Sequence, residues 1–79
     1  MTIKSSKPVE YTITDYKGVE TTLFGYKSLK KNIYGNWKAY IGRNVVETFA
    51  SAFDAADWFL GKDCEAEDIT EFLKLHNMH

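Results

Sequence analysis

The chain has 79 residues with a formal net charge of −1, and 44 % of its residues are hydrophobic and 15 % aromatic. This length suits one small domain, and the 19 Leu, Ile, Val and Phe residues exceed the share typical of disordered chains. The nearly neutral charge argues against a dedicated nucleic-acid binder, because such proteins are usually strongly basic.

The cysteine content indicates the compartment. Cys64 is the single cysteine, so no internal disulfide can form, whereas small secreted domains usually carry several. The first residues show no signal-peptide core, and no stretch has the length of apolar residues needed to span a bilayer. We therefore expect a soluble, cytoplasmic protein with no membrane partner.

The first eight residues are polar and end at Pro8. Such termini are often poorly ordered, so we expect a flexible arm over residues 1–8 and a single domain over residues 9–79.

A β-hairpin is predicted over residues 9–24, where apolar and polar residues alternate. A two-residue loop, Lys17-Gly18, would scatter the apolar side chains over both faces. A three-residue loop, with Gly18 in the left-handed conformation, pairs Ile13 with Thr21 and Tyr11 with Leu23. We predict the three-residue loop because it places five apolar residues on one face, and that face sets the register. These residues are Val9, Tyr11, Ile13, Val19 and Leu23.

Residues 25–36 allow two interpretations. The alternation of Tyr26, Ser28 and Lys30 with their neighbours favours a strand that turns near Gly35-Asn36. The alternative is a single helical turn capped by Ser28. We favour the strand, because the apolar residues are interleaved with turn residues and do not have helical spacing.

A second hairpin is predicted over residues 37–49. Its loop is Gly42-Arg43-Asn44, since Asn tolerates the left-handed conformation well. This loop pairs Ile41 with Val45, Ala39 with Glu47 and Trp37 with Phe49.

Two helices follow. Ser51 and Asp54 have the spacing of a capping box, which predicts a helix over residues 52–60 that ends before Gly61. A second helix is predicted over residues 65–75, with Asp63 as its N-cap.

The strands come first and the helices last, an order typical of the α+β class. We expect an antiparallel sheet of about four strands, built from two hairpins, followed by two helices packed on one face. The predicted core consists of Tyr11, Ile13, Leu23, Trp37, Ile41, Phe49, Ala56, Phe59, Ile69, Phe72 and Leu73.

Catalytic and metal-binding patterns are weak. Cys64 with His76 would make a nucleophile and a base, but neither lies in a recognisable catalytic context. His76 and His79 have a spacing that suits a metal on a helix, yet they lack a convincing third ligand. No glycine-rich phosphate loop is present. We expect neither enzymatic activity nor a cofactor or metal.

Charge is sorted along the chain. Residues 1–50 hold eight Lys and Arg against four Asp and Glu, whereas residues 51–79 hold two against seven. This predicts a basic sheet side and an acidic helix side, either of which can dock on a partner of opposite charge. The candidate basic residues are Lys30, Lys31, Lys38 and Arg43, with Tyr40. The candidate acidic residues are Asp54, Asp57, Glu67, Asp68 and Glu71.

A nucleic-acid-binding regulator is the alternative. Basic residues interleaved with aromatic ones are typical of surfaces that bind single strands. Here they are Tyr26, Lys27, Lys30, Lys31, Tyr34, Lys38, Tyr40 and Arg43. The near-neutral charge makes nucleic acid less favoured than a protein partner.

The stretch from Gly25 to Gly61 holds a basic segment, a Trp37-led hairpin and a capped, alanine-rich helix around Ala55-Ala56. This pattern resembles short accessory proteins of phages and prophages. Together with the second helix it is similar to small α+β anti-CRISPR proteins. The resemblance implies a phage-encoded inhibitor that binds a host defence nucleoprotein or nuclease in the host cytoplasm. It assigns no site residue by position. We expect the chain to be a monomer or a homodimer.

Overall fold

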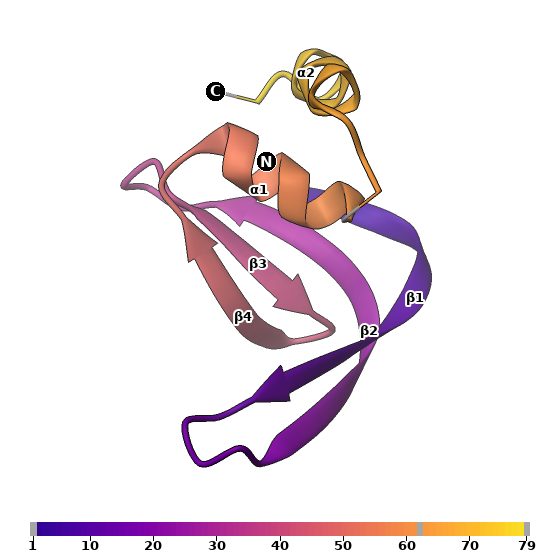
Figure 1. The fold of residues 1–79 in the computed structure, drawn as a ribbon. Helices are drawn as coiled ribbons and strands as arrows, with labels where there is room; N and C mark the ends of the chain where they lie inside the picture. Colours follow the sequence, from indigo (N-terminus) through magenta and orange to yellow (C-terminus); the bar gives the residue numbers. More distant parts are fainter. Residues whose placement is uncertain (1, 62, 79) are drawn as a thin grey trace.

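A computed structural model describes residues 2–61 and 63–78. Along the chain, four strands come first and two helices follow (Figure 1). The strands form one sheet in the order β1-β2-β3-β4, and each strand is antiparallel to its neighbours. This confirms the predicted α+β fold. The elements are β1 (Thr2–Thr14), β2 (Glu20–Lys31), β3 (Trp37–Ile41), β4 (Asn44–Phe49), α1 (Ala52–Leu60) and α2 (Ala66–Leu75).

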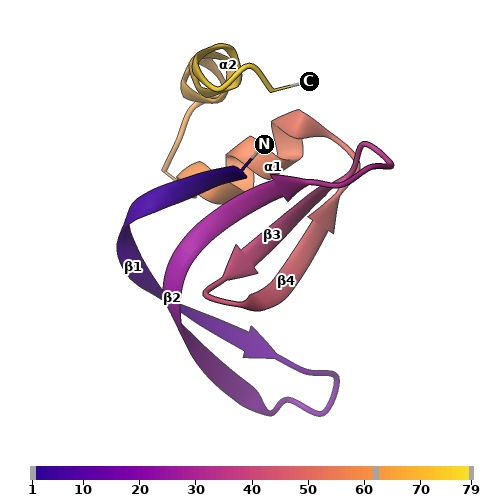
Figure 2. The same ribbon diagram turned by 180° about the vertical axis from the view of Figure 1, so that it is seen from behind.

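Both helices lie on the same side of the sheet, as Figures 1 and 2 show from opposite directions. Helix α1 contacts β2, β3 and β4, and α2 packs chiefly on α1. The two small residues Ala55 and Ala56 are fully buried, which lets α1 approach its neighbours closely. Among the residues described, no helix has the length and apolarity needed to cross a bilayer.

Residues 2–8 differ from the expectation of a flexible arm, and Met1, the first residue of that expected arm, lies outside the described residues. Residues 2–8 belong to β1, and Ile3 pairs with Leu29 and is only 5 % exposed. A register shift follows Lys4, and within it the Ser5 hydroxyl accepts a hydrogen bond from the Lys27 backbone N–H at 3.0 Å. One apolar side chain in a polar segment is therefore enough to tie the strand to the sheet.

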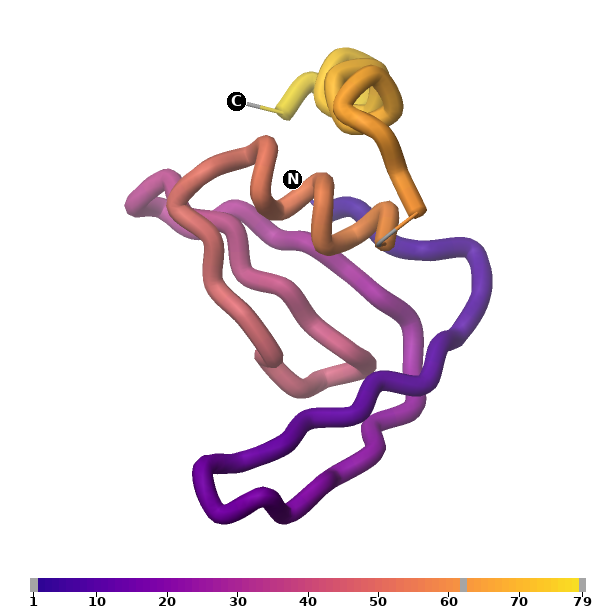
Figure 3. The backbone as a smooth tube through the Cα atoms, viewed as in Figure 1, coloured from indigo at the N-terminus to yellow at the C-terminus, as the bar shows by residue number. Residues whose placement is uncertain are grey.

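The three-residue loop of the first hairpin is confirmed. Ile13 pairs with Thr21 and Tyr11 with Leu23, and Gly18 has a φ of 81°. The predicted burial is wrong at the far end, where Ile13 is 36 % exposed. Figure 3 gives the reason: this end of the curved β1–β2 ribbon extends away from both helices, so nothing covers its apolar face.

The strand interpretation of residues 25–31 is confirmed, because they continue β2 and pair with β3 from Lys27 onward. The turn that follows is held by the Asn32 side chain, whose Oδ1 accepts hydrogen bonds from the backbone N–H groups of Tyr34 and Asn36, both at 2.9 Å.

The second hairpin has a shorter loop than predicted. Ile41 pairs with Asn44 and not with Val45, so only Gly42 and Arg43 remain in the loop. A register shift after Ala39 then restores the predicted pairs of Ala39 with Glu47 and Trp37 with Phe49. The extra residue is absorbed inside the strand pair as a bulge, which alternation alone cannot locate.

Helix α1 has its predicted bounds, and the Ser51 hydroxyl accepts hydrogen bonds from Phe53 N and Asp54 N. The predicted cap of α2 is wrong: Glu65, not Asp63, is the N-cap. The Asp68 carboxylate accepts a hydrogen bond from the Glu65 backbone N–H at 3.0 Å, which satisfies a donor at the start of the helix.

The core lies between the sheet and the helices. Of the predicted core residues, Trp37, Ile41, Ala56, Ile69 and Phe72 are buried. Five others are half-buried, namely Tyr11, Leu23, Phe49, Phe59 and Leu73. The core also includes five residues that the sequence analysis did not select, namely Ile3, Leu29, Ala39, Ala55 and Met78.

Candidate functional site

The face of the sheet opposite the helices carries most of the candidate basic residues. On β2 and β3, Leu29 pairs with Ala39, and both are fully buried. Because successive residues of a strand point to opposite faces, the pairs on either side of them point away from the helices. These pairs are Ser28 with Tyr40 and Lys30 with Lys38. We call this surface the basic sheet face: Lys4, Tyr26, Ser28, Lys30, Lys38, Tyr40 and Arg43.

Two shallow hollows mark this face, and they share Lys30 and Tyr40. The larger, of about 410 Å³, is lined by Thr2, Ser28, Lys30, Tyr40, Gly42 and Arg43. The smaller, of about 190 Å³, is lined by Lys30, Lys31, Asn32, Lys38 and Tyr40. The structure thus brings four of the five basic-side residues selected from the sequence together on this face, namely Lys30, Lys38, Tyr40 and Arg43. Lys31 pairs with the buried Trp37, on the other side of the strand, and only borders the smaller hollow.

Lys30 and Lys38 lie directly opposite each other on neighbouring strands. Like charges in this position destabilise a strand pair, because the two side chains leave the sheet side by side. Within residues 2–61 and 63–78, no carboxylate forms an ion pair with Lys30, Lys38 or Arg43. The repulsion is therefore not neutralised by the described chain itself.

Sequence analysis missed Lys4, because it assigned the residue to a flexible arm. In the structure, Lys4 pairs with Ser28, and its ammonium lies 4.8 Å from the centre of the Tyr26 ring. The residues around Lys4 are mostly polar and show no alternation, so the sequence offered no clear signal for this strand.

Lys27 does not belong to the basic sheet face. Its ammonium donates hydrogen bonds to the backbone carbonyls of Trp58 at 3.0 Å and Phe59 at 3.4 Å, and lies 4.8 Å from the centre of the Trp58 ring. A cation at this point compensates the free carbonyls at the C-terminal end of α1. Burial lowers the pKa of Lys27. Its role is structural, and the nucleic-acid set named above loses one member.

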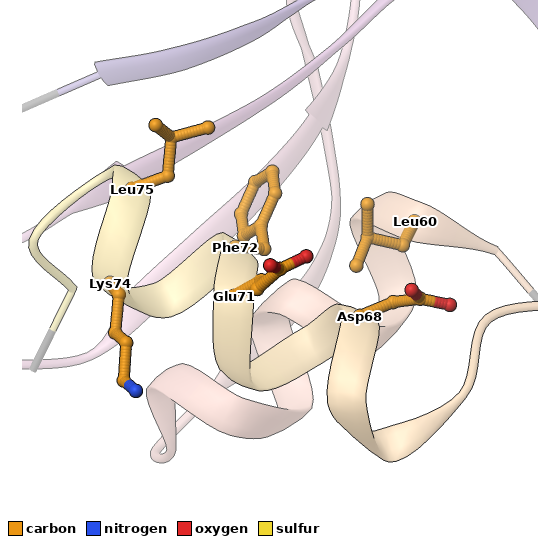
Figure 4. Close-up of a pocket in the computed structure, with 6 residues that line it drawn as sticks. All are labelled: Leu60, Asp68, Glu71, Phe72, Lys74 and Leu75. Carbon is orange, nitrogen blue, oxygen red and sulfur yellow. The ribbon is translucent and has the colours of Figure 1, made fainter.

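The acidic candidates are all exposed, but they do not form one group. Asp57 accepts a hydrogen bond from the Cys64 thiol, and Asp68 caps α2. Asp68 and Glu71 border a groove of about 660 Å³ between the end of α1 and α2, shown in Figure 4. The other residues that line it are Leu60, Phe72, Lys74 and Leu75.

The Cys64 thiol is poorly suited to nucleophilic chemistry. Desolvation and the neighbouring Asp57 carboxylate both raise its pKa, which lowers the fraction of reactive thiolate. His76 packs on the Phe72 ring, with 4.4 Å between the ring centres. In the described part of the chain, no three His, Cys, Asp or Glu side chains are grouped so as to hold a metal ion, and His79 lies outside it.

The basic sheet face therefore groups charged residues on one surface, whereas the acidic candidates are spread over the helices and two of them are engaged within the fold. Comparison of the chain with protein-family models, with curated proteins and with solved structures finds no match.

Proposed function

We propose that the chain is a non-enzymatic protein-binding module that docks through its basic sheet face onto an acidic surface of a larger protein. The observation that carries the proposal is the Lys30–Lys38 pair, which places two like charges opposite each other without a counter-ion from the described chain. Carboxylates of a partner would remove this repulsion and add charge-assisted hydrogen bonds.

The shape of the face supports a protein partner. Tyr40 is half-buried between the two hollows and is flanked by Lys30 and Lys38. An aromatic side chain surrounded by charged groups is typical of the centre of a protein interface. The acidic charge of residues 51–79 gives the molecule two poles, which orients it as it approaches an acidic surface.

The resemblance to small phage proteins extends the proposal to a biological role. In that role the partner is a host defence nucleoprotein or nuclease, and docking blocks its working surface. The acidic helices offer a less favoured docking mode, since two of their five candidate carboxylates are already engaged within the fold.

Nucleic-acid binding is the second candidate function, and one observation favours it. Tyr26 and Tyr40 lie on the same face as Lys4, Lys30 and Lys38, and tyrosines between basic side chains provide stacking surfaces for single strands. The small net negative charge disfavours this candidate.

Charge reversal tests the proposal. Lys30→Glu with Lys38→Glu is compared with the matched acidic reversal, Asp54→Lys with Asp57→Lys, in quantitative capture of host proteins on the immobilised chain. We expect the lysine reversal to abolish capture of a specific acidic protein and the aspartate reversal to preserve it. The opposite pattern would identify the helices as the docking surface.

The same variants are titrated with a labelled single-stranded oligonucleotide at several salt concentrations. Wild-type binding that weakens steeply with salt and is lost in the lysine reversal, without capture of any acidic protein, would replace the proposal with the nucleic-acid candidate.

A further inference from the structure

Strand β2 is paired on both sides over only part of its length. Strand β3 pairs with residues 27–31 of β2 and then turns away at Gly42. Beyond them, Gly42 N donates a hydrogen bond to the Tyr26 carbonyl at 3.0 Å. From Glu20 to Gly25, β2 pairs with β1 alone, and Figure 3 shows this part of the ribbon projecting from the body of the molecule.

The alternation of the strand identifies the unused backbone groups. The Tyr26 carbonyl points toward β3, and the register with β1 is uninterrupted from Tyr26 to Glu20. Every second residue of β2 therefore points its N–H and C=O to the same side. Phe24, Thr22 and Glu20 present these groups to an edge with no opposite strand in the described chain. We call residues 20–24 the open β2 edge.

Natural proteins protect exposed strand edges with proline, charged side chains, especially lysine, or a bulge. The outer edge of β1 contains Lys7, Pro8 and a register shift, and the β3–β4 pair contains another shift. The open β2 edge has no proline, lysine or register shift, and its one charged residue, Glu20, lies at its end. Its Phe24 side chain is 71 % exposed, an unusual degree of exposure for an aromatic residue in a strand.

We infer that the open β2 edge pairs with the same edge of a second copy of the chain, in antiparallel register about Thr22. The β3–β4 turn limits the available segment, because a Cβ atom at Gly25 would lie 2.8 Å from Gly42 N. Residues 20–24 remain, and of these Phe24 lies next to the turn, its carbonyl oxygen 3.9 Å from a Cβ built at Gly42. A twofold axis at Thr22 pairs Thr22 with its copy and Phe24 with Glu20 of the second copy, and all three outward-facing residues then gain partners.

Charge and symmetry favour a second copy over another extended segment. Glu20 is the one charged residue of the open edge, and antiparallel pairing separates the two Glu20 side chains to opposite ends of the interface. The arrangement is closed, since each edge is used once, so it gives a dimer and not a fibre. Five paired residues bury less area than a standard stable interface. We therefore expect a dimer that dissociates on dilution.

Sedimentation equilibrium over about a hundredfold concentration range tests the association. The variant Thr22→Pro removes an N–H donor from the open β2 edge without touching the β1–β2 ladder. Thr12→Pro is the matched control: Thr12 pairs with Thr22, their hydroxyls lie 3.3 Å apart, and the Thr12 N–H points to the outer edge of β1. We expect wild type and Thr12→Pro to dimerise with increasing concentration, and Thr22→Pro to stay monomeric.

Cross-linking tests the register without relying on the proline variants to fold. In a Cys64→Ser background, Thr22→Cys places two thiols across the twofold axis, where paired Cα atoms about 5.5 Å apart suit a disulfide. Thr12→Cys is the control, two strands farther from its own copy. We expect rapid oxidation to a covalent dimer only for Thr22→Cys. A wild type that stays monomeric throughout, equal cross-linking of both variants, or species larger than a dimer would overturn the inference.

Discussion

Replacing Gly25 by alanine tests one close contact in the fold, between β2 and the β3–β4 turn at Gly42. Gly25 lies on β2, and a Cβ built there would be 2.8 Å from Gly42 N and 2.9 Å from Gly42 Cα, whereas ordinary contact begins near 3.4 Å. Both atoms belong to the backbone, so no side chain can move aside. The β3–β4 turn must shift, which weakens the hydrogen bond from Gly42 N to the Tyr26 carbonyl.

Whether Gly25→Ala raises or lowers the free energy of unfolding depends on this contact. Gly25 lacks the positive φ that favours glycine, so an unobstructed alanine would stabilise the fold by about 0.4–1 kcal/mol through the unfolded chain. Overpacking costs about 1–3 kcal/mol, and the weakened hydrogen bond adds up to about 1 kcal/mol. We expect a net loss of about 1–3 kcal/mol, which lowers Tm by about 5–20 °C in a domain of this size.

Urea unfolding followed by circular dichroism measures this loss as a lower midpoint with an unchanged slope. The control is Thr21→Ala in the same strand, an exposed position where we expect a change within about 0.5 kcal/mol. A Gly25→Ala variant as stable as wild type, or more stable, would refute the reasoning. It would mean that the β3–β4 turn is not held against β2 as described.

Three further outcomes are expected from thermal and urea unfolding. Phe72→Ala removes a buried ring that packs on Phe59, at 5.2 Å between centres, and should cost about 3–5 kcal/mol, whereas Leu75→Ala, 81 % exposed on the same helix, should cost little. Ser51→Ala removes the cap of α1 and should cost about 1 kcal/mol. Burial lowers the pKa of Lys27 from its ordinary 10.5, so the unfolded chain binds more protons between the lowered value and 10.5. Unfolding free energy should therefore rise with pH across that window, relative to Lys27→Met, and parallel curves for the two proteins would contradict this.

Most of the residues of the candidate site could be predicted from the sequence, but their common face could not. The basic residues were identified from composition, but period-two alternation does not reveal which face of a strand the helices cover. Lys27 and Lys30 are both lysines of β2, yet Lys27 binds the C-terminal end of α1 and Lys30 lies on the basic sheet face. Only the position of α1 over the sheet separates the two roles.

Local chemistry determined much of this fold in advance. The Ser51 cap and Gly61 set the bounds of α1, Gly18 set the first loop, and the change from period two to helical spacing set the α+β order. Each depends on residues close together in the chain, whose geometry is fixed by backbone hydrogen bonds and by the left-handed conformation of glycine.

Tertiary packing decided the rest. Ile3 and Met78, near opposite ends of the chain, are both buried in one core cluster, and no local pattern predicts that they belong to the same cluster. The same packing leaves Ile13 exposed, because the two short helices cover only one end of a long β1–β2 ribbon. Phe24 is exposed because it lies on the face of β2 that points away from the helices, like Tyr26 two residues later. Burial depends on which surfaces meet, and a local pattern specifies only which side chains are able to be buried.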